Sequence, residues 1–298
     1  MKLQIRGFEL TYPRILFGTV LLITVIGIGI GLVTSSAAYG PYNHDWDGTS
    51  DLRTLAGGAG ADVEIVGLSI EYQEANAEKA TAFILEPSEP YSDSETQEIE
   101  SFLNRGGTVV VASGSGGSAN HLLTELDIES RFDGYRLRDE QRYYRSPAFP
   151  VAAPTQDTWV TENVSQLTLN HGTAVTPSDD GLVLINSSEF SYLDVNANHQ
   201  LDEDEPIREH PVVVQEDVES GSVIIVSDLS VFINGMLERT DNHQFAKNIV
   251  TGSETVLFDI QDEDAVPSVI AFSMIAVGSP YMLILFAVIF VLLALVNH

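Results

Sequence analysis

Apolar residues are concentrated at the two ends of the chain. A run without any charged residue extends from Ile15 to Val33, and as a helix it would span ~28 Å, close to the hydrocarbon thickness of a bilayer. A second apolar stretch extends from Val266 to Val296 and is interrupted at Gly278-Ser279-Pro280. The pattern predicts two transmembrane helices, over residues 15–37 and 267–296, the second kinked near its proline.

The predicted orientation follows from three basic residues before the first run, which are Lys2, Arg6 and Arg14. By the positive-inside rule, residues 1–14 are cytoplasmic, residues 38–266 form an extracellular domain, and the C-terminus returns to the cytoplasm. The alternative is a cleavable signal peptide, because Ser35-Ser36-Ala37 resembles a small-residue cleavage site. The run is longer than the apolar core of most signal peptides, which favours an anchor retained in the cell membrane.

Between these ends, short apolar strands alternate with amphipathic helices. Thr81–Leu85 and Thr108–Ala112 are predicted strands, and the second is apolar enough to be buried on both faces. Ser92 and Glu95 have the spacing of a capping box, which opens a helix that ends at Gly106-Gly107. This alternation predicts right-handed βαβ units on a parallel sheet, and hence an α/β domain.

The pattern changes between residues 131 and 211. Short extended pieces such as Gly181–Ile185 are separated there by Pro, Asp and Asn, which predicts a β-rich insertion. The α/β pattern resumes with a buried strand at Ser222–Asp228, and Thr255–Phe258 is the last predicted strand. Two helical faces are expected between them, formed by Phe232, Ile233, Met236 and Leu237 and by Phe245, Ile249 and Val250.

The acidic residues lie almost entirely between the two apolar ends. The chain has 43 Asp and Glu against 14 Lys and Arg, a formal charge of −29, and residues 38–266 alone carry −31. Such a field excludes a binder of nucleic-acid backbones unless positive charge is segregated. One explanation of the acidic charge is a negative electrostatic field that attracts a ligand, for instance cations. A lysine-poor acidic surface is also typical of proteins in near-saturating salt, so we interpret the charge as halophilic adaptation.

A Gly/Ser-rich loop follows the strand 108–112. Its candidate residues for holding an anion or another ligand are Ser113, Gly114, Ser115, Gly116 and Gly117. Backbone N–H groups and the dipole of a following helix favour an anion there, but a tight turn without a ligand is the commoner explanation. The loop also nearly matches a nucleophile elbow, with Ser115 as the nucleophile and Asp228 and His243 as the available acid and base.

A second candidate site is an acidic segment that resembles a twelve-residue calcium loop. The predicted ligands, by position in such a loop, are Asp194, Asn196, Asn198, Gln200, Asp202 and Glu205. The departure is His199, which stands where glycine normally makes the sharp turn. The segment is therefore a candidate site for a divalent cation such as calcium, and a solvated acidic turn without a metal is the commoner explanation.

A third candidate is an arginine–aromatic patch, formed by Arg136, Arg138, Arg142, Arg145, Tyr143 and Tyr144. On an acidic protein, such a patch could bind a carboxylate, an acidic glycan or a partner subunit. The alternative is internal pairing with Asp133, Asp139 and Glu140. Two glycosylation sequons, at Asn163 and Asn186, fit an extracellular domain.

Three stretches carry a family resemblance. They are Tyr42–Ser50, Phe102–Val111, and Gly221–Asp228 with Asn234 and Asn242 beyond. Together they resemble the membrane-anchored domain-of-unknown-function 4350 family, which is common in haloarchaea. That family is similar to the periplasmic domain of gliding-type ABC-transporter auxiliary proteins, and both look like the class I glutamine-amidotransferase fold. The resemblance implies a flavodoxin-like α/β sandwich, here flanked by two transmembrane helices.

The resemblance does not carry a catalytic activity with it. In the amidotransferase fold, the loop that corresponds to Ser113–Gly117 leads to a catalytic cysteine, and this chain contains no cysteine. Disulfides and Cys-ligated metals are excluded for the same reason. We therefore expect a non-enzymatic extracytoplasmic binding or scaffold domain that contacts membrane lipid and other membrane or cell-envelope proteins, and no nucleic acid. The alternatives are an auxiliary subunit of an ABC-type transporter and a serine hydrolase that uses Ser115.

Overall fold

The computed structural model describes residues 3–5, 8–10, 12–68 and 70–278. The core of the domain is a nine-stranded mixed sheet in the order β3-β15-β4-β5-β14-β13-β11-β8-β9. Its parallel strands are β3 (Asp62–Ile65), β15 (Thr255–Asp259), β4 (Ala80–Leu85), β5 (Thr108–Ala112) and β14 (Gly221–Val226). Antiparallel strands continue the sheet, namely β13 (Pro211–Val218), β11 (Leu182–Asn186), β8 (Val151–Pro154) and β9 (Leu167–Thr168).

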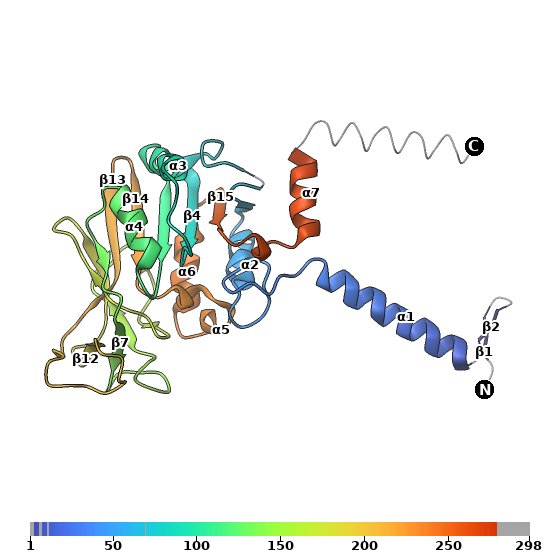
Figure 1. Cartoon of the computed structure of the whole chain (residues 1–298), viewed down its shortest axis with the longest axis horizontal. Helices are drawn as coiled ribbons and strands as arrows, with labels where there is room; N and C mark the ends of the chain where they lie inside the picture. Colours follow the sequence, from blue (N-terminus) through green and yellow to red (C-terminus); the bar gives the residue numbers. More distant parts are fainter. Residues whose placement is uncertain (1–2, 6–7, 11, 69, 279–298) are drawn as a thin grey trace.

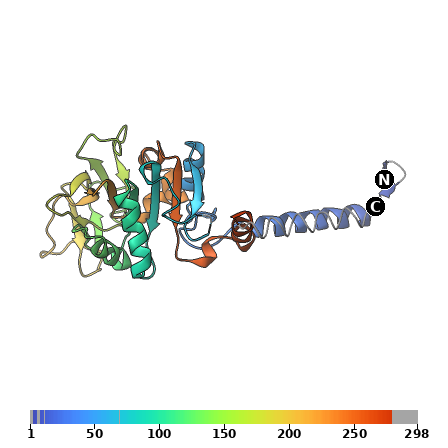
Figure 2. The same cartoon turned by 90° about the horizontal axis from the view of Figure 1, so that it is seen from above.

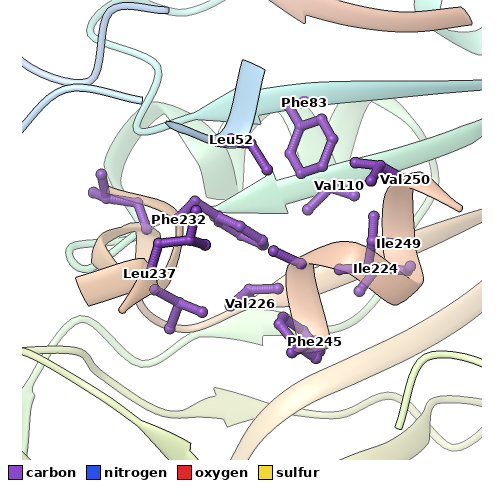
Figure 3. Close-up of a cluster of buried hydrophobic side chains, with 14 of the residues drawn as sticks. Leu52, Phe83, Val110, Ile224, Val226, Phe232, Leu237, Phe245, Ile249 and Val250 are labelled. Carbon is purple, nitrogen blue, oxygen red and sulfur yellow. The ribbon is translucent and has the colours of Figure 1, made fainter. Parts of the chain in front are cut away.

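Helices cover both faces of the parallel strands. One face packs against α2 (Ser50–Gly58), α5 (Asn234–Leu237) and α6 (Asn242–Val250), and the other against α3 (Asp93–Asn104) and α4 (Gly117–Glu125). Successive side chains of β5 alternate between the two cores, with Val110 on the first and Val109 and Val111 on the second. Figure 3 shows the first core, where Phe83 and Phe232 meet edge to face with ring centroids 5.4 Å apart.

The β-rich region 131–211 is continuous with the main sheet. Its strands β8, β9 and β11 extend the sheet through β13, so it shares the hydrophobic core of the parallel part. The region also contains two small antiparallel ribbons, β6 (Arg131–Phe132) with β10 (Val175–Thr176) and β7 (Arg136–Asp139) with β12 (Ser191–Asp194). The structure therefore confirms an α/β fold with a β-rich section, built on one mixed sheet.

The local predictions succeed where a side chain fixes the backbone. The capping box is present, because the Glu95 N–H donates to Ser92 Oγ at 3.4 Å and the Ser92 N–H donates to Glu95 Oε2 at 2.8 Å. The helix expected around 232–237 is instead divided into a 3-10 turn, Leu229–Phe232, and the single turn of α5. Ile233 has an extended backbone between them and interrupts the helix.

The apolar ends of the chain leave the domain as helices. The helix α1 (Tyr12–Gly31) covers most of the first apolar run and extends away from the domain (Figure 1 and Figure 2). Apolar side chains such as Phe17 are exposed on it. The helix α7 (Ser268–Gly278) begins the second run, and the rest of that predicted helix lies outside the described residues. Among the described residues, no helix was found that combines the length and the apolarity needed to cross a membrane.

The remaining elements are short. A hairpin of β1 (Leu3–Ile5) and β2 (Phe8–Leu10) precedes α1. Two further 3-10 turns, Ala77–Lys79 and Glu263–Ala265, lead into β4 and toward α7.

Replacing Phe245 by alanine is expected to lower the free energy of unfolding by about 3–5 kcal/mol, because the ring is fully buried and its loss leaves a cavity beside Phe232. Ile207→Ala is the control: this side chain is 53% exposed, and its removal should change stability by no more than about 0.5 kcal/mol. Urea unfolding of the full chain in concentrated KCl, followed by circular dichroism, measures both. Equal losses in the two variants would contradict the core described here.

Candidate functional site

Polar side chains gather where the parallel strands end. Glu86 directly follows β4, Ser115 lies in the loop after β5, and Asp228 lies just beyond β14. These three side chains line a cavity of about 720 Å³, together with Arg136 and His171 from the β-rich region. We call it the strand-end cavity. Carboxyl ends of parallel strands meet at one edge of a sheet, which is why residues so far apart in sequence converge there.

Glu86 organises the loop after β5. Its carboxylate accepts hydrogen bonds from the Gly114 N–H at 2.7 Å, from Ser113 Oγ at 3.1 Å and from Ser115 Oγ at 2.5 Å. The Glu86 N–H donates to the carbonyl of Ala112 at 2.8 Å. The backbone of Glu86 has φ +45°, a left-handed conformation that costs a side-chain-bearing residue roughly 1–2 kcal/mol. These hydrogen bonds hold the strained residue in place.

Asp228 joins the core of the sheet to the β-rich region. The side chain is buried, and its carboxylate accepts hydrogen bonds from the backbone N–H groups of Asn170 and of Ser230, the latter at 2.9 Å. Gly172 must be glycine, because a Cβ there would lie 2.7 Å from the Cβ of Asp228. Burial raises the pKa of Asp228 to about 6, while these hydrogen bonds and the charge of Arg136 act in the opposite direction.

Arg136 and His171 line the cavity on the side of the β-rich region. The Arg136 guanidinium donates to the carbonyl of His171, and His171 Nδ1 lies 2.7 Å from Asn170 Oδ1. Burial lowers the pKa of His171, and the neighbouring charge of Arg136 lowers it further. Burial raises the pKa of the Tyr39 hydroxyl, with a further increase from the Glu86 carboxylate. The site therefore holds groups of both charge signs within one cavity.

An exposed tryptophan stands on the rim of the cavity. The indole of Trp46 is 68% exposed, and its backbone carbonyl accepts a hydrogen bond from the Gly235 N–H at 2.9 Å. Asn234 holds the same segment through Nδ2, which donates to the carbonyls of Asn43 at 3.1 Å and Asp45 at 2.7 Å. Contacts between two of the stretches that carry the family resemblance, Tyr42–Ser50 and the one that includes Asn234, thus fix the backbone around Trp46.

A second cavity, of about 480 Å³, shares the lining residues Tyr39, Glu86 and Ser115 with the first. Its wall includes residues 38–40, which follow α1, and Ala265, which precedes α7. The hydroxyl of Ser35 donates to the carbonyl of Asp264 at 2.5 Å, so the segments leading to the two terminal helices are in contact. The edge of the sheet that carries the site therefore faces the side from which both helices leave.

The predicted loop takes part in the site, but the predicted triad is not assembled. Gly114 and Ser115 line the strand-end cavity, whereas His243 lines a different cavity, of about 780 Å³, formed mainly by α2 and residues 237–247. The left-handed residue of the loop is Gly116, with φ +82°, and not Ser115. In the part of the chain that the structure describes, no histidine bonds to Ser115, whose hydroxyl donates to Glu86.

The acidic loop after β12 is folded around its own side chains. Asp194 accepts from the N–H groups of Asn198 at 3.1 Å and His199 at 3.0 Å, and Asp202 accepts from the amides of Asn196 at 2.7 Å and Asn198 at 2.6 Å. His199 adopts φ +67°, the conformation for which the loop usually has glycine. Among the described residues, no group of three or more His, Asp or Glu is placed to hold a metal ion. Calcium binding stays a prediction.

The predicted arginine–aromatic patch is divided among several places. Arg136 lines the strand-end cavity. The Arg138 side chain donates to the hydroxyl of Tyr192 at 3.2 Å. The guanidinium groups of Arg145 and Arg239 lie over the ring of Tyr144, at 5.1 and 5.3 Å from its centroid. These contacts distribute the positive charge, so the structure does not bring the predicted residues together as one surface.

The alternative prediction is that the arginines pair with nearby acidic residues, and Asp139 instead bonds to the backbone. Asp139 is buried, and its carboxylate accepts hydrogen bonds from the backbone N–H groups of Gln141 at 2.8 Å and Arg142 at 2.7 Å. Tyr143 is 43% exposed. Of the two sequons, Asn163 is exposed, whereas Asn186 is half-buried at the end of β11 and donates to Glu209 at 3.2 Å.

Sequence reasoning missed Glu86, His171 and Trp46. A usable signal existed for Glu86, because it is a charged residue directly after a buried strand, much as Asp228 lies two residues beyond the end of β14. The carboxyl-end rule for α/β sheets would have selected both. No local signal marks His171, because its place depends on the path of the β-rich region around the sheet.

Replacing Glu86 by alanine is expected to lower the free energy of unfolding by about 2–3 kcal/mol, because the loop loses hydrogen bonds to a charged group. Glu86→Gly should cost about 1 kcal/mol less than Glu86→Ala, since glycine adopts the positive φ without strain. Urea unfolding of both variants tests this difference. Indistinguishable midpoints for the two variants would show that the backbone at Glu86 is not strained.

Several comparisons place the chain among known proteins. No curated protein sequence matches it. The N-terminal domain of mmIFT52 is similar in fold, with a TM-score of 0.45, 14% identity and coverage of 59% of this chain and 77% of that one. A cytoplasmic protein of Salmonella typhimurium LT2 has a TM-score of 0.45, 14% identity and coverage of 68% and 86%.

A ThuA-like protein of Bacteroides uniformis is a further structural match, with a TM-score of 0.37, 15% identity and coverage of 60% of this chain and 70% of that one. These likenesses concern the fold alone. The sequence comparison is more specific: the profile described as domain of unknown function DUF4350 matches residues 41–250, which include every strand of the main sheet except β15. The chain belongs to the DUF4350 family.

Proposed function

We propose that this protein is a membrane-anchored, non-enzymatic binding domain whose ligand occupies the strand-end cavity. One observation carries the proposal: side chains from separate parts of the chain, Glu86, Arg136 and Asp228, converge on one cavity at the carboxyl ends of the parallel strands. Ligands of open α/β sheets bind outside these strand ends. The polar groups there are fixed before a ligand arrives, which reduces the entropic cost of binding.

The state of Ser115 supports binding over catalysis. A serine nucleophile needs a base that removes its proton and a backbone that presents its hydroxyl. Here the left-handed turn of the loop falls on Gly116 and not on Ser115, so the backbone does not present the hydroxyl as a nucleophile elbow does. The cysteine that the resembling fold uses for catalysis is missing from the sequence. Both features favour a role for the loop in shaping the cavity.

Attachment to the cell membrane, with the domain outside, is the second part of the proposal. Its support is the uncharged run 15–33, together with the exposed apolar side chains of α1, such as Leu16 and Phe17. Both terminal helices leave from the edge that carries the cavity, so a ligand there would lie next to the membrane surface and to membrane partners. An auxiliary role in an ABC-type exporter is the alternative, and co-purification of an ATPase or permease would favour it.

Binding predicts a ligand-dependent rise in thermal stability. The full chain in detergent and concentrated KCl is heated with panels of sugars, amino acids, dicarboxylates and nucleosides, and the melting temperature is recorded. A ligand at a hundred times its Kd adds about 2.7 kcal/mol, which raises Tm by about 5–10 °C. The rise should be lost in Asp228→Asn and Arg136→Gln. It should persist in Lys247→Gln, which alters a different cavity. A panel without any stabilising compound would contradict the proposal.

The hydrolase alternative rests on the hydrogen bond from Ser115 to Glu86, since a carboxylate can accept a proton from a serine. We expect no labelling of the chain by a fluorophosphonate probe, because no histidine in the described part of the chain bonds to Ser115. Intact-protein mass spectrometry detects the adduct. Labelling of the wild type that disappears in Ser115→Ala would establish a reactive serine and overturn the non-enzymatic assignment.

A further inference from the structure

We propose that the ligand of the strand-end cavity is a saccharide, whose pyranose ring stacks on Trp46 while its hydroxyl groups bond to the charged side chains behind it. This inference rests on the proposed function, since it names the class of ligand for the same cavity. It is carried by three features of the lining: the mixture of charges, the exposed aromatic surface and the size.

The charges of the lining favour a ligand that both donates and accepts hydrogen bonds. Asp47, Glu86 and Asp228 line the cavity, so an anion would be repelled, and Arg136 adds a hydrogen-bond donor beside these acceptors. A polyhydroxyl ligand has no net charge and can both donate and accept hydrogen bonds. Each of its hydroxyls can donate to a carboxylate and accept from the guanidinium, which satisfies both kinds of group at once.

The aromatic surface supplies a binding face for a ring. Trp46 is 68% exposed at the rim, and Phe149 and Tyr39 also line the cavity. A pyranose has an apolar face of C–H groups, and covering an indole with that face removes apolar area from water. Because Asn234 and Gly235 fix the backbone of Trp46 by hydrogen bonds, the ring is presented from a rigid support.

The size of the cavity agrees with this class. A volume of about 720 Å³ lies in the range of roughly 300–1,000 Å³ that is usual for small-molecule sites. It accommodates one or two sugar rings. A longer chain could leave through the open rim where Trp46 stands.

The chain offers a direct test, because it contains two tryptophans, Trp46 and Trp159. In the full-length Trp159→Phe variant, Trp46 is the sole tryptophan, so its fluorescence reports on the cavity. We expect a saturable change in emission on titration with at least one of glucose, galactose, N-acetylglucosamine, maltose and cellobiose. Glycerol at equal concentration controls for unspecific polyol effects and should cause no saturable change.

Matched variants identify the stacking contact by thermal shift. Trp46→Ala should weaken saccharide binding at least tenfold, and Trp46→Phe should restore it to within about fivefold of the wild type, because a smaller aromatic ring still stacks. Trp159→Ala is the control and should change affinity less than twofold, since Trp159 is similarly accessible, at 46%, but does not line this cavity.

The outcomes separate this inference from the proposed function. Stabilisation by amino acids, dicarboxylates or nucleosides, without any by sugars, would overturn the saccharide assignment and leave the cavity as a binding site. Equal losses in Trp46→Ala and Trp159→Ala would overturn the stacking contact. If no compound of any class changes either Tm or the emission of Trp46, the proposed function fails as well.

Discussion

The burial of the parallel strands on both faces is the constraint on which the rest of the structure depends. Every side chain from Val109 to Ala112 of β5, and from Val223 to Val226 of β14, is fully buried between the two layers of helices. A polar group in the middle of such a strand would lose its hydration without a partner. Polar side chains can therefore be accommodated at the strand ends, and that is where Glu86, Ser115 and Asp228 lie.

Polar groups at a buried edge need partners, and their choice of partners connects distant parts of the chain. Glu86 bonds to the loop of the neighbouring strand, and Asp228 bonds to Asn170 in the β-rich region. The carboxylate of Asp228 thus ties the β-rich region to the sheet at the point where Arg136 and His171 reach the cavity. The hydrogen bonds that satisfy the buried carboxylate of Asp228 therefore also bring the residues of the site together.

The sequence predicts the elements whose causes are local. The unbroken apolar strand at Thr108–Ala112 and the capping box at Ser92 need no information from elsewhere, and both were found where they were expected. The arginine cluster shows the opposite case. Arg136 and Arg138 lie on the same face of β7, yet their guanidinium groups reach different partners, the carbonyl of His171 and the hydroxyl of Tyr192, which come from distant parts of the chain. The acidic loop follows β12, and its Asp194 carboxylate accepts hydrogen bonds from the backbone of Asn198 and His199.

Trp46 illustrates why the whole site could not be predicted from the sequence. Its segment, Tyr42–Ser50, resembles a family, but the side chain that fixes this segment belongs to Asn234, nearly two hundred residues away. A buried amide that bonds to two carbonyls of another segment specifies position more sharply than apolar contact, because its hydrogen bonds have direction. Asn43, Asp45 and Asn234, which belong to the stretches that carry the family resemblance, therefore act as the frame that holds the segment of the exposed Trp46.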